Sequence, residues 1–345
     1  MKYRSASGCL IIFILAPLVF LFFSCASVKV TTAEEYFSLG MAYFDLGQAA
    51  SDSSVRTKYF LEAEKWLSRA RSVDKTKSAS EYNMGRIAFE TGRYQDALKY
   101  FEGILKKDSN NILALKASAY TRIKTGDIDA AETHYKKLLA LIPESADDGY
   151  NYALVLYYME KYENAEEVLA RFRYALFDNS NSLLLYARTQ KALNKIEAAD
   201  TYERWLVNNK DAKVRCEYAA VLETQEFYAR ALEEYRLALD ELAETSIDPK
   251  KSDIRFYIAR LLMIADRENE EGIKELQEAS GGGYANLGEF EKLAEDSRIS
   301  DAARNALLAI IEGIKQKPEP LQKTETESGE ENSGDTMPEN ESKET

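Results

Sequence analysis

Small residues recur at a fixed spacing through the middle of the chain. Two sets of four follow one another at 34-residue steps, the members of the first set lying 12 residues before those of the second: Gly85, Ala119, Ala153 and Ala187, then Ala97, Ala131, Ala165 and Ala199. Self-similarity at a period of about 20–50 residues indicates an array of stacked structural repeats. The spacing therefore predicts four gapless units over residues 78–111, 112–145, 146–179 and 180–213.

Each unit has the pattern of two short helices joined by a turn. In the first regular unit, apolar residues fall at helical spacing over 81–90 and again over 94–101, with Thr91 and Gly92 between them. Helices of this length are marginal alone, so they must bury one continuous apolar surface by stacking. No segment shows the alternating pattern and hairpin turns of a β-strand pair. The sequence predicts an all-α fold.

The positions of the small and large residues resemble the tetratricopeptide repeat (TPR). A large or amphipathic residue follows four positions after the second small residue in three units, at Phe101, Tyr135 and Leu169. The resemblance implies a TPR-type α-solenoid of about six to seven helix-turn-helix repeats over residues 32–280, with a C-terminal capping segment over 281–317 that contains a capping helix.

The outer units are less regular than the central four. Gly40 and Ala63 occupy the two small positions of the first unit but lie 23 residues apart, so we expect an insertion near residues 48–57. Towards the C-terminus the pattern weakens until three consecutive glycines, 281–283, interrupt it. Residues 300–317 should then form a last amphipathic helix that covers the end of the stack.

The N-terminus resembles the signal peptide of a bacterial lipoprotein. Lys2 and Arg4 precede an apolar run over residues 9–23, which is too short as a helix to cross a hydrocarbon core of about 30 Å. Ser24 before Cys25 resembles a lipobox, although Phe23 departs from it. Residues 1–24 are therefore the expected signal, Cys25 the expected lipid attachment site and 25–31 a short tether. Simple secretion by cleavage near Cys25 is the alternative.

Charge and chemistry exclude several classes of function. The net charge is −13 with no block of Lys or Arg, which argues against nucleic-acid binding. The tail over residues 318–345 is acidic and polar, and we expect it to be disordered. His134 is the only histidine, Cys216 is the only cysteine outside the signal segment, and no nucleophile, phosphate-loop or metal-ligand motif occurs. We expect no enzymatic activity, no metal and no cofactor.

The TPR resemblance also implies where a partner would bind, because the first helix of each unit lines a concave groove in that family. The matching positions here are Phe37, Met41, Phe44, Tyr82, Arg86, Phe89, Lys116, Tyr120, Tyr150, Tyr157, Arg188 and Lys191. Some of them could instead pack between neighbouring helices. Aromatic and arginine side chains are enriched at binding hot spots. We expect the groove to take an extended or helical segment with an acidic group, and expect Arg86→Glu with Lys116→Glu to abolish capture without changing stability.

Together these features predict a membrane-tethered TPR scaffold that mediates protein–protein interactions in the bacterial cell envelope. It would be lipid-anchored and periplasm-facing, with the outer membrane favoured because no Asp follows Cys25. Its partner would be a protein or peptide segment of an envelope complex. The alternative is a transporter-associated accessory protein that binds a small solute.

Overall fold

The computed structural model describes residues 32–73, 78–177, 179–243, 246–265 and 270–316. The regular structure of these segments is helical, without a strand, as the repeat pattern predicted. The expected signal peptide, Cys25, the tether and the acidic tail lie outside the described residues. None of the described helices is long and apolar enough to cross a membrane.

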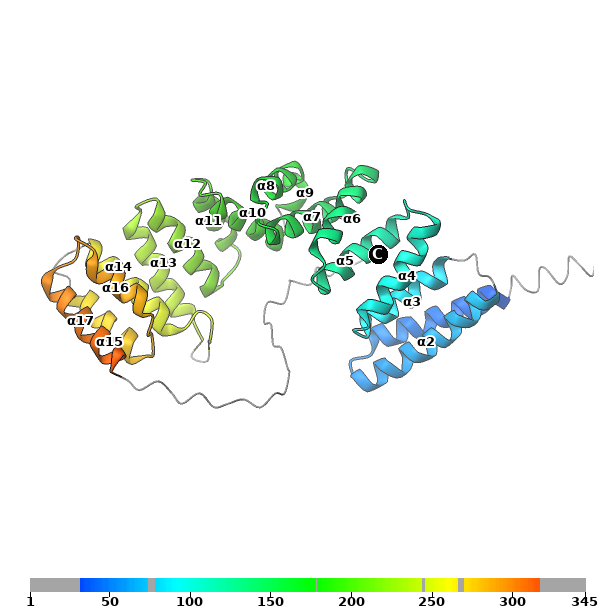
Figure 1. The fold of residues 1–345 in the computed structure, drawn as a ribbon, viewed down its shortest axis with the longest axis horizontal. Helices are drawn as coiled ribbons and strands as arrows, with labels where there is room; N and C mark the ends of the chain where they lie inside the picture. Colours follow the sequence, from blue (N-terminus) through cyan, green and yellow to red (C-terminus); the bar gives the residue numbers. More distant parts are fainter. Residues whose placement is uncertain (1–31, 74–77, 178, 244–245, 266–269, 317–345) are drawn as a thin grey trace, which may run out of the picture. The chain divides into compact units, whose positions relative to one another are not determined.

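The chain divides into two compact units, residues 1–168 and 169–345. Within each unit, successive helices pack in antiparallel pairs (Figure 1). Unit 1 contains a helix over residues 32–49, then α2 (Ser53–Val73), α3 (Ser78–Glu90), α4 (Tyr94–Lys107), α5 (Ile112–Lys124), α6 (Ile128–Leu141) and α7 (Ala146–Tyr158). The unit boundary falls within α8 (Tyr162–Arg171). Unit 2 contains α9 (Arg173–Leu176), α10 (Ser180–Ala192), α11 (Ala198–Leu206), α12 (Ala212–Thr224), α13 (Tyr228–Glu241), α14 (Lys251–Ala265), α15 (Glu270–Gly281), α16 (Leu287–Glu295) and α17 (Asp301–Lys315).

The helix boundaries follow the 34-residue register. The first helices of the four regular repeats begin at Ser78, Ile112, Ala146 and Ser180, each 34 residues after the last. The next first helix begins at Ala212, after a shortening of two residues. The sequence period therefore fixes both the number and the start of these helices.

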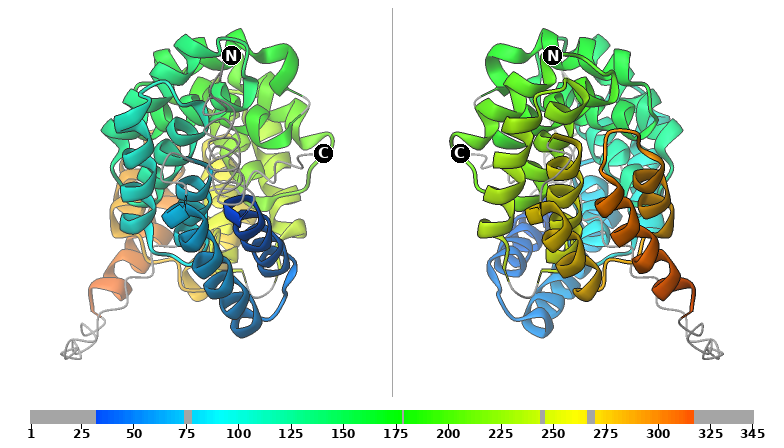
Figure 2. Two further views of the ribbon diagram at one scale, coloured as in Figure 1. Left: turned by 90° about the vertical axis from the view of Figure 1, so that its right-hand side faces the viewer. Right: turned by 90° about the vertical axis from the view of Figure 1, so that its left-hand side faces the viewer.

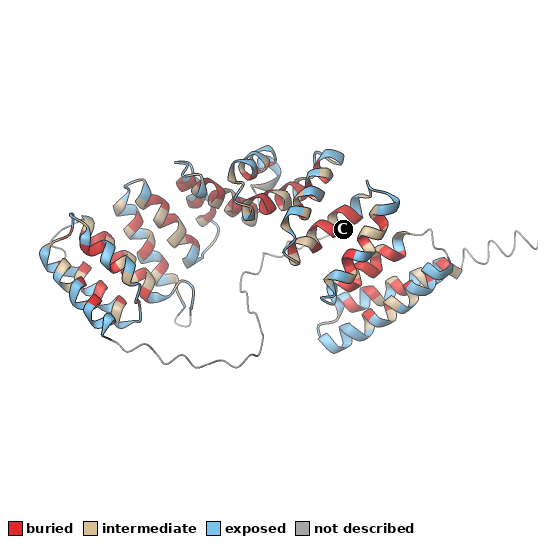
Figure 3. Ribbon diagram, viewed as in Figure 1, coloured by how far each residue is buried: buried red, intermediate tan, exposed pale blue. Residues whose placement is uncertain are grey.

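Small residues mark the places where two helices of a pair approach closely. A Cβ atom added to Gly85 of α3 would lie 2.5 Å from Cε1 of Phe101 in α4. Ala131 and Ala165 occupy the equivalent of Ala97 in later repeats, and all three are fully buried. Figure 3 shows the buried residues gathered on the sides of the helices that face one another. A larger side chain at these positions would force the helices apart.

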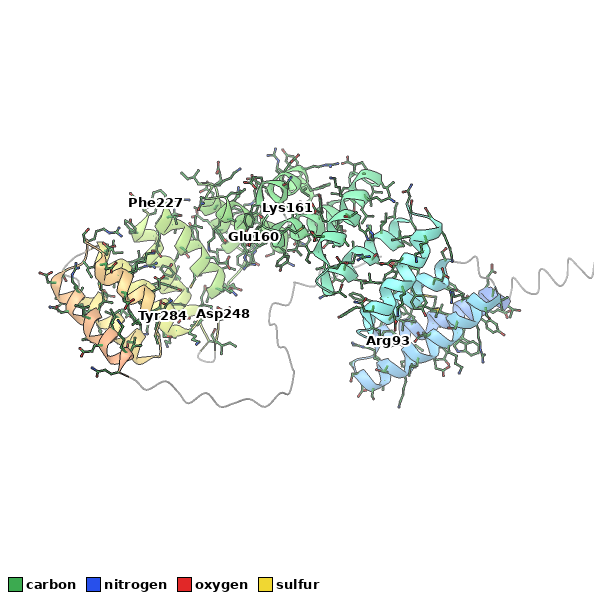
Figure 4. All side chains as sticks on the ribbon, viewed as in Figure 1. Arg93, Glu160, Lys161, Phe227, Asp248 and Tyr284 are labelled. Atoms are coloured by element: carbon green, nitrogen blue, oxygen red, sulfur yellow. The ribbon has the colours of Figure 1, made fainter. Side chains whose placement is uncertain are left out.

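The turn within each repeat uses one residue in the left-handed region. The φ angles are 74° at Gly92, 77° at Gly126, 58° at Glu160, 53° at Asn194 and 63° at Glu226. The next residue closes the turn by donating its N–H to a carbonyl five residues back, as Arg93 does to Ala88 and Lys161 to Leu156. Arg93, Lys161 and Phe227, which follow three of these turns, are labelled in Figure 4. Only two repeats place glycine where the left-handed conformation is unstrained.

The expected insertion in the first unit lengthens its helices. The helix over residues 32–49 is followed after a short connection by α2, which has 21 residues where α4 has 14. Gly40 lies against Leu67, and Gly47 lies against Phe60. The extra residues thus extend an antiparallel pair and do not form a separate loop.

The C-terminal end of unit 2 is covered by two further helices. α16 and α17 contact each other, and α17 also contacts α15. Phe256 of α14 stacks on Tyr284 with ring centroids 4.3 Å apart, and Phe290 of α16 meets both rings edge-on. The helix expected at residues 300–317 is α17, which buries Leu307 and Ile311 in this cluster.

Candidate functional site

Most of the expected groove residues of unit 1 are half-buried, but two belong to the core. Phe37 and Met41 pack partly exposed against a cluster that contains Phe44. Phe44 is only 2% exposed and Tyr150 only 3% exposed, so their rings support the surface from beneath. A periodic pattern cannot separate these cases, because the helix face that lines a groove continues into the face that packs on the next helix.

Three aromatic rings connect neighbouring helices in unit 1. Phe89 of α3 lies 5.3 Å from the ring of Tyr94 in α4 and 5.4 Å from that of Tyr120 in α5, centroid to centroid. Tyr82 similarly lies 5.8 Å from Phe101. These rings remain partly exposed and present flat apolar surface to solvent. Such surface gives large contact area at low conformational cost when a partner binds.

The two expected cations of unit 1 differ in their surroundings. The Arg86 guanidinium lies 4.5 Å from the centroid of the Phe44 ring and donates to Asn83 Oδ1 at 3.4 Å. It has no carboxylate partner among the described residues. The Lys116 ammonium, by contrast, lies 2.9 Å from a carboxylate oxygen of Asp148, whose side chain is 4% exposed. Of the two, only Arg86 therefore offers a charge that an acidic partner could meet.

Tyr157 lies at the end of α7 in a small group of tyrosines. Its ring centroid is 6.1 Å from that of Tyr158 and 5.4 Å from that of Tyr162, both in edge-on contacts. Tyr158 is 45% exposed. This group is a second patch of accessible aromatic surface in unit 1.

In unit 2, the two expected cations are again one paired and one unpaired residue. Arg188 of α10 donates twice to Glu217 of α12, with both distances 2.9 Å. Lys191, one turn further along α10, has no ion-pair partner within the described part of the chain. Lys191 lines a cavity of about 460 Å³.

This cavity is formed on the first helices of successive repeats and has an aromatic wall. Its lining includes Cys216 and Ala220 of α12, Tyr257 and Arg260 of α14, and Tyr284 before α16. The Tyr257 ring lies 5.3 Å from Tyr235 of α13 and 5.4 Å from the Arg260 guanidinium, measured at ring centroids. Figure 4 labels Tyr284 and Asp248, which both line the cavity.

Charged groups surround the aromatic wall and are largely paired. Arg260 donates to Glu223 at 2.6 and 2.7 Å, and the Tyr235 hydroxyl donates to the same carboxylate at 2.7 Å. Burial, and then the Glu223 charge, raise the pKa of Tyr235. Lys213 pairs with Asp248 at 2.7 Å on the rim. Lys191 is therefore the lining cation that a ligand could reach without breaking an internal pair.

Cys216 contributes an unreactive thiol to this cavity. Burial, followed by the nearby carboxylates of Glu217 and Asp211, raises its pKa to about 12. The thiolate is the nucleophilic form of cysteine, so it is essentially unpopulated at neutral pH. The thiol acts here as a small apolar lining group.

A second cavity, of about 560 Å³, lies between α2, α3 and α4 in unit 1. Glu81 in it is 8% exposed and accepts from Arg71 at 3.0 Å and from Lys107 at 2.7 Å. Burial opposes ionisation, but the hydrogen bonds from Lys107 and Arg71 outweigh it and lower the pKa of Glu81. The three charges join three helices, which gives this cluster a structural role.

The expected site missed the residues of α12 and α14 in the cavity. Carrying the repeat register forward from Ala187 to Ala219 and Ala259 would have identified them, since Cys216, Ala220 and Arg260 then occupy the positions of Leu184, Arg188 and Arg188. Tyr284 lies after the three-glycine break, where the register no longer applies. Among the described residues, no group of three or more His, Cys, Asp or Glu side chains is arranged to hold a metal ion.

Comparison with known proteins identifies the repeat. A family model described as tetratricopeptide repeat matches residues 88–151. A TPR repeat-containing protein of Methanocaldococcus jannaschii is 31% identical over 110 residues, which is 32% of this chain and 19% of that protein. An uncharacterized lipoprotein of Treponema pallidum is 24% identical over 174 residues, 50% of this chain and 83% of that protein.

A solved structure supports the same fold. The crystal structure of a tetratricopeptide repeat protein from Parabacteroides merdae superposes with a TM-score of 0.50 at 18% identity, covering 81% of this chain and 99% of that one. The fold is thus that of protein–protein interaction scaffolds. The chain is a tetratricopeptide repeat protein, and proteins of this family bind peptides or other proteins.

Proposed function

We propose that this protein is a membrane-tethered scaffold that holds a peptide segment of a cell-envelope partner in the unit 2 cavity. The observation that carries the proposal is the cavity of about 460 Å³ on the first helices of successive repeats. Its wall of Tyr235, Tyr257 and Tyr284 combines aromatic surface with the unpaired Lys191. A few polar groups set in an aromatic concave surface are typical of binding sites.

The charge on the occupant follows from the pairing of the lining residues. Arg188, Lys213 and Arg260 are already neutralised by carboxylates within unit 2. Lys191 keeps its charge available, so an acidic side chain or a terminal carboxylate on the bound segment would gain an ion pair there. In unit 1, Arg86 offers an equivalent contact beside the rings of Tyr82 and Phe89.

Residues before the described part support an envelope location. Cys25 follows a short apolar run and a lipobox-like Ser24, and a lipoprotein of Treponema pallidum shares half of the chain at 24% identity. Seven residues separate Cys25 from Thr32, which span at most about 25 Å when extended. A lipid on Cys25 would keep the repeats close to the membrane that carries it, facing the periplasm.

Site-specific photo-crosslinking in whole cells tests the cavity. A photoreactive phenylalanine analogue at Tyr257 should capture a recurrent envelope protein, identified by mass spectrometry. The same analogue at Tyr174, which is 85% exposed and outside the cavity, is the matched control and should not capture that protein. Lys191→Glu should weaken capture at Tyr257. Equal capture from both positions would show that the cavity does not select a partner.

The anchor is tested separately. Metabolic labelling with a fatty-acid analogue should mark the full chain and leave Cys25→Ala unlabelled and released from membranes. Equal labelling of both would place the lipid elsewhere, and no labelling of either would indicate simple secretion.

Binding of a small solute is the second candidate, because the cavity volume lies within the range of about 300–1,000 Å³ typical of ligand pockets. It predicts that carboxylate-bearing solutes alone raise the melting temperature of the purified protein, and that Lys191→Glu removes the effect. Absence of any such shift, together with a partner captured at Tyr257, would favour the scaffold.

A further inference from the structure

The first helix of the array has an apolar stripe on the side turned away from α3. Tyr36, Leu39, Tyr43 and Leu46 are spaced 3, 4 and 3 residues apart, the interval at which helix residues form a packing seam. Leu39 is 38% exposed and Leu46 is 48% exposed. The opposite side, with Phe37, Met41 and Phe44, packs into the core that includes residues of α3.

α2 continues this stripe into a two-helix face. Val55, Tyr59, Glu62, Trp66, Arg69 and Val73 follow one another at steps of 4, 3, 4, 3 and 4. Tyr59 lies 6.4 Å from Tyr43, and Trp66 lies 5.7 Å from Tyr36, at ring centroids, so the two stripes adjoin. Val55 is 38% exposed and Val73 is 39% exposed. We call these ten residues the N-terminal face.

The two ends of the repeat series are treated differently. At the C-terminal end, α16 and α17 bury the apolar side chains of α14 and α15. At the N-terminal end, residues 32–49 and α2 form the last described pair of unit 1, seen side by side in the left view of Figure 2. Terminal repeats normally carry a polar outer face, because an uncovered apolar one promotes association. The N-terminal face instead carries four aromatic rings.

Charge is divided unequally between the two helices of this pair. Residues 32–49 contain Glu34, Glu35 and Asp45 and no basic residue, a net charge of −3. α2 contains five basic and two acidic residues, a net charge of +3. Lys58, Lys65 and Arg69 lie along the outer edge of the N-terminal face, and the Arg69 guanidinium lies 4.6 Å from the Trp66 ring centroid. The face is therefore complementary to itself after exchange of its two helices.

We propose that the N-terminal face binds the same face of a second copy of this chain. A two-fold axis parallel to the helices places residues 32–49 of one copy over α2 of the other and forms a four-helix bundle. Acidic helix then meets basic helix twice, because both contacts of a two-fold interface are identical. A two-fold axis perpendicular to the helices would instead place like charges opposite each other. Seam spacing on both helices fits interdigitating helix packing.

Apolar residues of the face provide the first test. The mass of the full-length chain in mild non-ionic detergent, measured by light scattering over a range of concentrations, should be that of a dimer. Leu39→Asp with Leu46→Asp should raise the dissociation constant at least about 100-fold, since each buried apolar anchor is worth about tenfold or more. Leu61→Asp is the matched control, because Leu61 is 61% exposed on the opposite side of α2. It should leave the dimer intact.

Charge exchange provides the second test and identifies the occupant. One variant carries Lys58→Glu, Lys65→Glu and Arg69→Glu, and the other carries Glu34→Lys, Glu35→Lys and Asp45→Lys. Each should be monomeric alone, because both helices then have the same sign. Mixed together they should form a heterodimer. Circular dichroism should show that both variants keep the helicity of the parent.

Two results would overturn the proposal. One is a parent chain that is monomeric at all concentrations while its face variants lose binding to phospholipid vesicles, which would make the membrane the occupant. The other is a parent dimer that the aspartate variants leave unchanged, which would place the interface elsewhere.

Discussion

The Lys116 ammonium lies 2.9 Å from a carboxylate oxygen of Asp148, and this pair joins α5 to α7 across a repeat boundary. The Asp148 side chain is 4% exposed, whereas that of Lys116 is 40% exposed. Removing Lys116 leaves a nearly buried carboxylate with fewer partners, although Ser145 still donates to it at 2.5 Å. This pairing changes the expected result of the double charge reversal derived from the sequence.

Lys116→Glu should destabilise unit 1, because it places a second carboxylate against Asp148. We expect the free energy of unfolding to fall by about 1–3 kcal/mol, measured by urea denaturation. Arg86→Glu, which breaks no ion pair, is the matched comparison and should cost less. An unchanged stability of Lys116→Glu would mean that Asp148 is hydrated in solution. Arg86 alone is therefore the clean reporter of partner binding in unit 1.

Glu160→Gly should stabilise the protein. Glu160 has φ of 58° at the turn position that Gly92 and Gly126 occupy in earlier repeats, and the left-handed region costs a non-glycine residue about 1–2 kcal/mol. The greater entropy of glycine in the unfolded chain offsets part of that gain. We expect a net rise in the melting temperature. Gly126→Ala should lower it, and effects of the same sign in the two variants would contradict the turn assignment.

Ala131→Leu tests the close approach of helices within a repeat. Ala131 of α6 is fully buried, so a larger side chain there should cost about 1–3 kcal/mol of stability by overpacking. Ala140 lies on the same helix but is exposed. Ala140→Leu should therefore leave the thermal melting midpoint nearly unchanged, which separates packing from helix propensity.

His134 should make stability depend on pH between about 5.5 and 7. Burial, followed by the charge of Arg122, lowers the pKa of His134 in the folded state below the unfolded value of about 6.5. The unfolded chain then binds more protons, so stability is complete above the unfolded pKa and declines as the pH falls through it towards the folded pKa. It is the only histidine in the chain. His134→Gln should flatten the profile of chemical denaturation in this window.

Cys216 should resist alkylation in the folded protein. Its pKa of about 12 and partial burial predict labelling by iodoacetamide at mildly alkaline pH much slower than in urea-unfolded chain. Mass spectrometry of the peptide that contains Cys216 distinguishes it from Cys9 and Cys25. Rapid labelling of native protein would show that the unit 2 cavity opens to solvent.

The helix-turn-helix architecture could be predicted because the fold repeats a local rule. Close packing requires a small residue at one place in each helix, so Gly85 and Ala97, repeated every 34 residues, revealed both the pairing and its register. The insertion before Ala63 was also visible, but not its form, since a longer helix and a longer loop leave the same gap in the register.

The candidate site could be predicted only in part. Helical periodicity identified the face that contains Arg86, Tyr150 and Lys191, because residues on one face recur at fixed intervals. It could not show that Tyr150 is buried or that Lys116 already has a carboxylate partner, since both depend on side chains from other helices. The residues around Arg260 lie in weaker repeats, where the register was not carried forward.

By itself, the sequence determined the all-α class, the repeat length and the helix starts, because each depends on contacts between residues close together in the chain. Tertiary structure decided which cations remain unpaired, where a cavity opens on unit 2 and which end of the array carries uncovered aromatic rings. These properties depend on distances between side chains of different helices, and a one-dimensional period contains no such distances.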